Sequence, residues 1–304
     1  MMATMEPKSY YLPSTTYNLP IVVIVGPTAS GKTSLAIEVA KTCNGEIICA
    51  DSRSIYKGMD IGTAKPSKSD RLQVPHWGLD LANPGDYFSA ADFKTYANDK
   101  IKEIRSRGNV PFIVGGTGLY VDSVIFDYQF GKKADITTRN TLDKLTLEQL
   151  HDYCKKHNIT LPENEKNKRY VIRAIELCGL NISKRDHPIE NTIMIGLLID
   201  KELLRTRIDK RVEQLFDDGV VEEANALGKR YGWDSEAMKG NIYPLAHSYL
   251  LGGMSWEIMK AKFKILDWRL AKRQMTWLKR NPFIKWLSPT DAKTYLLNQL
   301  AKHS

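Results

Sequence analysis

Eight residues near the N-terminus have the composition and spacing of a phosphate-binding loop. They fill every required position of the pattern G-x-x-x-x-G-K-[ST], and they are Gly26, Pro27, Thr28, Ala29, Ser30, Gly31, Lys32 and Thr33. The glycines let backbone N–H groups turn toward an anion, Lys32 reaches a terminal phosphate, and the Thr33 hydroxyl is a ligand for Mg²⁺. The chain is therefore predicted to bind a di- or triphosphate together with Mg²⁺.

The residues around this loop supply the strand and the helix that it needs. An apolar run over 21–25 precedes it, and a helix-compatible segment over 34–41 follows it. The N-terminus of that helix adds partial positive charge where a phosphate would lie. This context favours a phosphate site over an ordinary glycine-containing turn.

Two more predicted strands end in residues that can do chemistry. The apolar run 46–50 leads into Asp51 and Ser52, and the run 110–114 leads into Gly-Gly-Thr-Gly at 115–118. Ligands of parallel sheets bind beyond the carboxyl ends of the strands. At this edge Asp51 could hold a metal through water or accept a proton, and the Thr117 hydroxyl could orient a substrate. The alternative for Asp51 is a turn or helix-capping role.

Short apolar strands alternate with helical segments, which predicts an α/β fold with a parallel P-loop sheet. A helix is expected around 90–107 and a further strand over 192–199, whereas everything after residue 201 is expected to be helical. Residues 127–187 are polar, helix-rich and without a convincing strand. The predicted organisation is a flexible tail (1–19), a P-loop core with C-terminal helices (20–126 and 188–304) and an inserted all-helical subdomain (127–187).

Positive charge is concentrated near the C-terminus. The whole chain has 44 Lys and Arg against 35 Asp and Glu, a net charge of +9. Nine of these cations and a single acid, Asp267, fall within 260–286. Apolar residues recur there at helical spacing, namely Met259, Phe263, Leu266, Leu270 and Trp277. We expect a helix with one packed face and a basic surface suited to nucleic acid, although a solvated basic face is the alternative.

The remaining composition indicates a cytoplasmic protein with no membrane partner. No apolar run has the length of a membrane-spanning helix, and the first twenty residues lack an export or transit signal. The four cysteines form no C-x-x-C pair, which favours reduced thiols.

Long motifs extend this pattern over nearly the whole chain. Together they resemble the tRNA dimethylallyltransferase family, and they comprise residues 26–33, 51–66, 75–76, Asp80, 88–93, 115–120, 173–176, 207–211 and 271–277. The resemblance implies that the loop binds the diphosphate of dimethylallyl diphosphate with Mg²⁺. The N6 amine of the adenosine that lies 3′ of the anticodon would then attack the allylic carbon.

The resemblance also implies roles for individual residues. Asp51 would accept the proton of the amine with help from Thr117, while Lys32, Thr33 and Arg211 would stabilise charge on the diphosphate. The implied tRNA contacts are Asp51, Ser52, Arg53, Ser54, Arg169, Arg173, Lys272, Arg273, Gln274, Trp277 and Lys279. For Arg169 and Arg173, one helical turn apart, the alternative is a surface row of ion pairs.

Two segments depart from the family pattern. A Gly-Tyr-Lys-Glu-like element is replaced at 241–246 by Asn-Ile-Tyr-Pro-Leu-Ala, and a Thr-Arg pair is replaced by Asp267 and Trp268. Both lie in the part expected to contact tRNA.

Three other functions stay open at this point. An adenylate isopentenyltransferase shares the front half of the pattern but does not need the basic C-terminal helix. A small-molecule kinase would use the same loop with ATP. A nucleotide-gated RNA-binding protein would use the loop and the basic helix without any prenyl transfer. The oligomeric state is expected to be monomeric.

Overall fold

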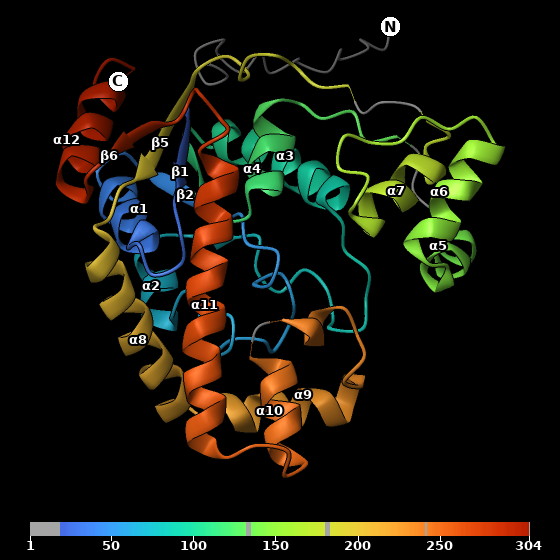
Figure 1. Ribbon diagram of the computed structural model, residues 1–304. Helices are drawn as coiled ribbons and strands as arrows, with labels where there is room; N and C mark the ends of the chain where they lie inside the picture. Colours follow the sequence, from blue (N-terminus) through green and yellow to red (C-terminus); the bar gives the residue numbers. More distant parts are fainter. Residues whose placement is uncertain (1–18, 132–134, 180–182, 241, 304) are drawn as a thin grey trace, which may run out of the picture. The chain divides into compact units, whose positions relative to one another are not determined.

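Six parallel strands form the central sheet of the protein. The computed structural model describes residues 19–131, 135–179, 183–240 and 242–303, so the expected tail lies almost entirely outside the described residues. The strand order is β3-β2-β4-β1-β5-β6 (Figure 1). The strands are β1 Ile21–Val25, β2 Gly45–Cys49, β3 His76–Trp77, β4 Val110–Gly115, β5 Thr192–Leu197 and β6 Lys285–Leu287. The predicted α/β fold with a parallel sheet is confirmed.

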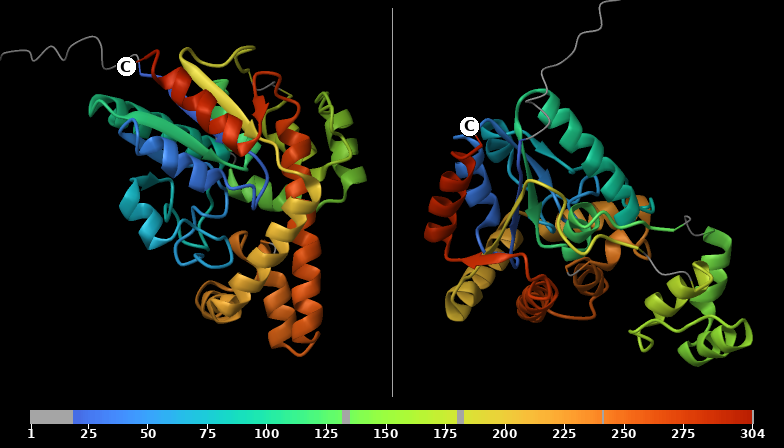
Figure 2. Two further views of the ribbon diagram at one scale, coloured as in Figure 1. Left: turned by 90° about the vertical axis from the view of Figure 1, so that its left-hand side faces the viewer. Right: turned by 90° about the horizontal axis from the view of Figure 1, so that it is seen from above.

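Helices cover both faces of this sheet, which explains why its central strands are apolar throughout. All residues of β1, β2 and β4 are buried. Helices α1 (Lys32–Ala40) and α12 (Pro289–Leu300) pack on one face, and α3 (Ala90–Ser106) and α4 (Gly118–Ile125) pack on the other (Figure 2). Continuous Val and Ile runs are typical of strands buried on both sides.

Two edge strands were not predicted from the sequence. Everything after residue 201 was expected to be helical, but β6 pairs in parallel with β5, with Trp286 opposite Gly196. A side chain at Gly196 would lie 2.6 Å from the Trp286 ring, so this glycine makes room for the indole. Strands of two or three residues, such as β3 and β6, are too short to show a periodicity.

The helices after β5 extend the fold beyond the carboxyl ends of the strands. Helices α8 and α11 run side by side, and α10 packs against both α9 and α11 (Figure 1). These helices are α8 Lys201–Asp217, α9 Val220–Tyr231, α10 Tyr243–Leu250 and α11 Trp256–Leu278; the short α2 spans Lys68–Gln73. None of the helices in the described part of the chain is both long and apolar enough to cross a membrane.

The expected basic helix is α11, but it is shorter than the predicted segment and its packed face differs. It ends at Leu278, and Pro282, four residues later, could not continue it. Its fully buried residues are Met259, Phe263, Asp267, Ala271 and Leu278, whereas Leu266, Leu270 and Trp277 are only half-buried. The predicted apolar stripe therefore contains a buried acid.

Residues 126–187 form a compact unit of their own. Its described helices are α5 Ile136–Lys144, α6 Leu147–Lys156 and α7 Lys168–Glu176. They enclose a separate apolar core of Leu142, Leu150, Cys154, Val171, Ile172 and Ile175. Each helix starts at a side-chain cap, since Asp135, Thr146 and Asn167 accept a hydrogen bond from the first helical turn.

Candidate active site

The phosphate loop joins β1 to α1 in a conformation that leaves amide groups available for an anion. Gly31 has a left-handed backbone (φ 89°) and stands at the N-cap of α1, where no side chain caps the helix. A residue with a Cβ would be strained at this φ. Uncapped N–H groups at a helix N-terminus attract negative charge. Local backbone geometry is thus compatible with the anion site that the motif predicts.

Three cations surround this loop. Lys32 donates to the carbonyl of Pro27 at 2.6 Å, Arg211 donates to the Thr28 hydroxyl, and Arg207 lies 3.4 Å from the carbonyl of Ser30. Both arginines come from α8, one helical turn apart. Burial lowers the pKa of Lys32 to about 8, with Asp51 opposing this shift and Arg211 adding to it. An anionic ligand beside this buried amine would raise its pKa again, because a nearby negative charge favours the protonated form.

Two polar atoms beside the loop are buried without any hydrogen-bond partner among the described residues. They are the Ser30 hydroxyl oxygen and Nε of Arg211. An unsatisfied buried polar group costs free energy, so such atoms point to a missing ligand. Phosphate oxygens would accept from both groups.

Asp51 and Thr117 meet at the neighbouring strand ends. Oδ1 of Asp51 accepts from the backbone N–H groups of Arg53 (2.8 Å) and Ser54 (3.3 Å), so this residue does form the turn that was the alternative to a catalytic role. The Thr117 hydroxyl accepts from the N–H of Ser52 at 3.0 Å. Arg53 points to the carbonyl of Glu236 at 2.8 Å. Thr117 therefore holds the turn that carries Asp51.

One cavity of about 550 Å³ joins these groups. It is lined by the loop residues 28–34, the turn 51–54, residues 114–117 and, from the C-terminal helices, Arg211, Tyr243, Phe263, Asp267, Leu270, Arg273 and Gln274. All of them belong to the sheet-containing unit. The phosphate loop and the predicted proton acceptor thus line the same cavity.

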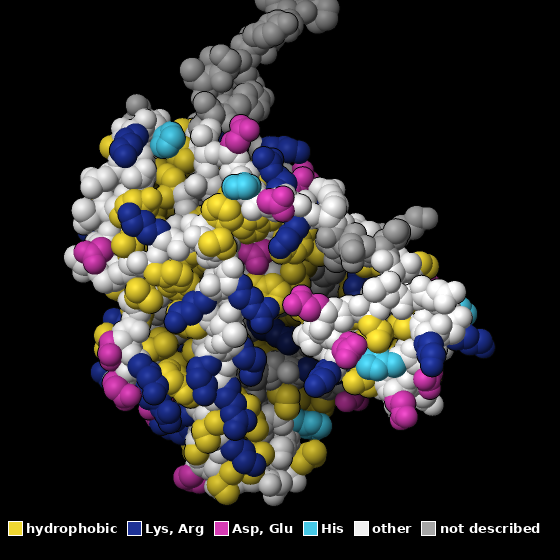
Figure 3. Space-filling model, turned by 45° about the horizontal axis from the view of Figure 1, so that its top comes forward, with side chains coloured by type: hydrophobic (Ala, Val, Ile, Leu, Met, Phe, Trp, Pro, Cys, Tyr) yellow, Lys and Arg dark blue, Asp and Glu magenta, His cyan; other side chains and the backbone are white. Residues whose placement is uncertain are grey.

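Helix α11 presents two different faces at this cavity. Gln274 accepts a hydrogen bond from the N–H of Thr28 at 2.7 Å, and Nε1 of Trp277 donates to Asp122 on α4 at 2.8 Å. Lys272, Arg273 and Lys279 are exposed. Lys and Arg side chains gather over this helix on the surface (Figure 3). Contacts of all five residues with tRNA stay predictions, but Gln274 and Trp277 have partners within the protein.

Comparison with known proteins agrees with this geometry. The family model described as IPP transferase matches residues 54–281, and the one described as isopentenyl transferase matches residues 19–75. A tRNA dimethylallyltransferase of Bacillus cereus is 40% identical over 288 residues, which are 90% of this chain and 91% of the relative. This chain belongs to the IPP transferase family.

Solved structures of the family share this fold. The full-length tRNA isopentenylpyrophosphate transferase of Bacillus halodurans matches with a TM-score of 0.72 and 35% identity, covering 93% of this chain and 97% of the other. The tRNA delta(2)-isopentenylpyrophosphate transferase of Staphylococcus epidermidis matches with a TM-score of 0.69 and 32% identity, covering 94% and 100%. The resemblance predicted from the motifs is confirmed along the chain.

Arg169 and Arg173, the two tRNA contacts predicted on the unit 126–187, have different surroundings in the structure. Arg169 on α7 is exposed. Arg173 is half-buried and forms an ion pair with Glu176 at 3.0 Å, and Glu176 also binds Arg139 at 3.0 Å. For Arg173 the ion pair that was the alternative is therefore present, while binding of either arginine to tRNA stays a prediction.

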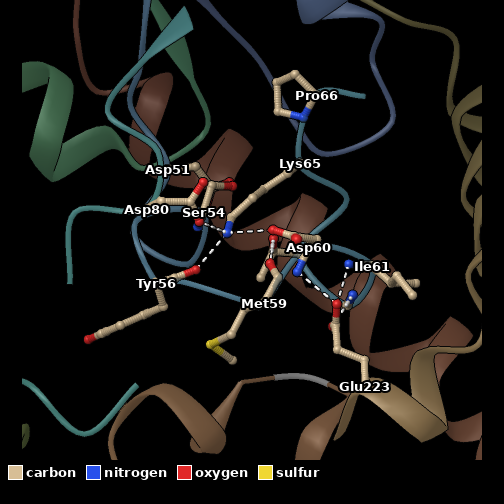
Figure 4. A network of polar contacts seen from close by, with 12 residues as sticks. Asp51, Ser54, Tyr56, Met59, Asp60, Ile61, Lys65, Pro66, Asp80 and Glu223 are labelled. Carbon is tan, nitrogen blue, oxygen red and sulfur yellow. Dashed lines mark hydrogen bonds and ion pairs between the residues drawn. The ribbon is translucent and has the colours of Figure 1, made fainter. Parts of the chain in front are cut away.

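The sequence analysis did not identify the residues that hold the segment 59–66, part of which lines the cavity. Nζ of the buried Lys65 donates to the carbonyl of Tyr56 and to the carboxylates of Asp60 and Asp80, at 2.6 to 2.8 Å (Figure 4). Three acceptors match its three protons. Lys65 lies in the motif 51–66, but nothing in the motif itself tells a structural lysine from a substrate-binding one.

Glu223 on α9 also binds the segment 59–66. Its carboxylate accepts from the N–H groups of Asp60, Ile61 and Gly62 at 2.7 to 2.9 Å and from the Tyr243 hydroxyl at 3.0 Å (Figure 4). Tyr243 is the residue that the altered 241–246 element shares with the family; Asn241 lies outside the described residues. The element thus keeps its link to the segment 59–66 despite Pro244 and Leu245.

The oxygen atoms that line the cavity fit Mg²⁺. The Thr33 hydroxyl and the Asp51 carboxylate are both at the cavity, and Mg²⁺ prefers hard oxygen ligands and retains several waters. No group of three or more His, Cys, Asp or Glu that could hold a metal occurs within the described ranges. A phosphate-loop site does not need such a group, because the phosphates supply most of the ligands.

Proposed function

We propose that this chain transfers a dimethylallyl group from dimethylallyl diphosphate to the N6 amine of the adenosine 3′-adjacent to the anticodon in tRNA. The observation that carries this proposal is the shared cavity, in which the phosphate loop faces Asp51 and Thr117 in a member of the IPP transferase family. Its relatives in Bacillus cereus and Bacillus anthracis, about 40% identical over 90% of this chain, are named tRNA dimethylallyltransferases.

In the proposed reaction the bond between N6 and the allylic carbon forms as the bond between that carbon and the diphosphate oxygen breaks. The electron pair of the broken bond leaves with diphosphate. The amine of adenine is a weak nucleophile because its lone pair is delocalised into the ring. Asp51 orients this amine and takes its proton, and Thr117 keeps the Asp51 turn in place.

Cations beside the loop stabilise the charge that grows on diphosphate. Lys32 and Arg211 both contact the loop, and the amides at the start of α1 add partial positive charge. When bound through Thr33, Mg²⁺ would supply further charge neutralisation for the leaving group.

Transfer RNA would reach this cavity along α11. The exposed Lys272, Arg273 and Lys279 suit phosphate groups, and the adenosine must leave its stack to enter a buried site. Bases of a loop are less constrained than paired bases, which lowers the cost of this step. We propose that the enzyme acts in the cytoplasm as a monomer.

The experiment is incubation with Mg²⁺, labelled dimethylallyl diphosphate and unmodified total tRNA, with AMP as a parallel acceptor, followed by mass analysis of nucleosides. Prenylated adenosine in tRNA supports the proposal. Label on AMP alone would establish an adenylate isopentenyltransferase instead. Phosphorylation of a small acceptor would favour the kinase, and nucleotide-dependent RNA binding without product would favour the RNA switch.

A further inference from the structure

The indole of Trp277 packs on the first turn of α4, the helix that follows Thr117. Gly118 is the first residue of α4, and a Cβ added there would come within 2.0 Å of Cδ1 of Trp277. One turn further along α4, Asp122 accepts the hydrogen bond from Nε1 of Trp277 at 2.8 Å. The indole therefore contacts α4 at two points, one helical turn apart, and holds the start of this helix against α11.

The position of Thr117 depends on this first turn. Its carbonyl accepts from two N–H groups of the turn, at 2.9 and 3.3 Å, so Thr117 belongs to the hydrogen-bonded start of α4. Its own N–H donates to the carbonyl of Ala50 at 3.2 Å, and its hydroxyl accepts from the N–H of Ser52 at 3.0 Å. Ala50 and Ser52 flank Asp51. A shift of the first turn of α4 would therefore disturb both contacts that hold the backbone around Asp51.

Trp277 also lines a groove of about 430 Å³ on the surface of α11. The groove is otherwise lined by four cations and a threonine, namely Arg269, Lys272, Arg273, Arg280 and Thr276. Contact with tRNA in this groove is the alternative role of Trp277. The single N–H of the indole already donates to Asp122, so RNA would gain only contact with the ring. Trp277 thus lies between a basic groove and the helix that positions Thr117.

We propose that Trp277 is a positioning residue for the prenyl transfer. It acts through the first turn of α4 on Thr117, and thereby keeps the Asp51 carboxylate where the substrate amine must lie. Trp277 does not line the cavity that contains the phosphate loop and Asp51, so it acts on the reaction only through its neighbours. This proposal rests on the proposed function, because it assumes that Asp51 takes the proton of that amine.

The test measures single-turnover prenyl transfer at saturating tRNA, together with the affinities for tRNA and for inorganic pyrophosphate. Trp277→Phe keeps an aromatic ring but loses the hydrogen bond to Asp122. Its rate should fall about 10- to 100-fold, because a small misplacement of a catalytic group has an effect of this size. Both affinities should stay within about threefold of native, since only the chemical step is impaired. The control is Trp256→Phe near the other end of α11, where the ring contacts Phe216 and Tyr249, and it should keep the native rate.

A second variant reaches the same contact from α4. The methyl group of Gly118→Ala would displace the indole, so its rate should fall like that of Trp277→Phe. Once Trp277→Ala has removed the indole, adding Gly118→Ala should lower the rate by no more than about twofold, because both changes break one contact. Effects of the two changes that multiply independently would overturn the proposal. A native rate in Trp277→Phe would also overturn it, and a weaker tRNA affinity in that case would assign Trp277 to RNA binding.

Hydrogen exchange of the peptide 50–55 follows the Asp51 turn without any assay of activity. The N–H groups of Ser52, Arg53 and Ser54 are hydrogen-bonded in this turn. They should exchange at least about threefold faster in Trp277→Phe than in the native protein. Native exchange in this variant would overturn the role of Trp277 alone. Absence of prenyl transfer by the native protein would overturn the proposed function instead.

Discussion

The two oxygens of the Asp51 carboxylate have different surroundings. Oδ1 accepts the N–H groups of Arg53 and Ser54, and the hydrogen bonds that this carboxylate accepts from the described residues all go to this atom. The turn therefore fixes the carboxylate while Oδ2 stays available to a substrate amine. A structural and a catalytic role are compatible in one side chain.

The first prediction concerns this residue. Asp51→Asn keeps an acceptor for the turn but loses the proton acceptor, so prenyl transfer should fall by about 10²- to 10⁴-fold while tRNA affinity changes little. Single-turnover kinetics and filter binding measure the two effects. Asp99→Asn, an exposed acid on α3, serves as the control. An Asp51→Asn enzyme with native rate would remove Asp51 from the chemistry.

Burial of the Lys32 amine lowers the folding stability of the ligand-free protein. Burial, the largest influence, lowers its pKa from 10.5 to about 8. Between these two pH values the unfolded chain binds one proton more than the folded chain at this site. Stability then rises with pH, since the slope follows the difference in bound protons.

The second prediction concerns how this loss of folding stability depends on pH. Lys32→Met removes the titrating group, so the stability of the native protein relative to this variant should increase from pH 8 toward pH 10.5, by up to about 1.4 kcal/mol per pH unit. Denaturant unfolding at several pH values, with EDTA present, measures it. A difference that stays constant over this range would contradict the low pKa.

At the scale of elements, α11 connects the cavity with the surface. Its inner face carries Gln274 and Trp277 with partners on the phosphate loop and α4, and its outer face carries exposed cations. The same inner face buries Asp267, whose Oδ2 lies 3.8 Å from Nη1 of Arg211. Where the family pattern has Thr and Arg, this chain thus places an acid beside a cation that contacts the phosphate loop.

The third prediction separates the faces of this helix. Replacing Lys272 and Arg273 by Ala should weaken tRNA binding and lower the slope of log affinity against log salt by about 1.5, because fewer counterions are released. Pyrophosphate affinity should stay within about threefold in the single variant Lys272→Ala, because Lys272 does not line the cavity and its distant charge is screened by salt. Lys41→Ala with Lys102→Ala, both exposed elsewhere, is the control pair. An unchanged slope would show that this face is merely solvated.

At the scale of the whole molecule, two units have separate cores. Residues 126–187 pack around Ile172 and its neighbours, whereas every residue that lines the described cavity belongs to the other unit. Damage to the helical core should therefore leave the phosphate site intact. The function predicted for this unit, contact with tRNA, depends on its own folding.

The fourth prediction follows from this division. Ile172→Ala removes a fully buried side chain and should destabilise the helical unit by about 2 to 5 kcal/mol. Affinity for tRNA should fall, and affinity for pyrophosphate should stay native. Thermal unfolding and the two binding assays measure this, with Glu148→Ala on the surface of the same unit as control. An equal loss of pyrophosphate binding would show that the units are not independent.

The sequence alone determined the parts whose chemistry is local. The phosphate loop needs only residues 26–33 between a strand and a helix, and the apolar runs of β1, β2, β4 and β5 are long enough to predict a parallel sheet. Asp51 and Thr117 could be placed at one edge because parallel strands end together. The motif residues 271–277 were likewise visible, but which of them face inward was not.

Tertiary structure decided what depends on distant partners. The hydrogen bond from Thr28 to Gln274 joins residues that are 246 positions apart. The hydrogen bonds that Glu223 accepts from Asp60, Ile61 and Gly62 likewise join segments with no common motif. In the edge strand β6, Trp286 packs against Gly196 of the distant strand β5. The buried Asp267 of α11 lies 3.8 Å from Arg211 of α8. Such contacts are set by how helices pack, and a linear pattern does not encode this directly.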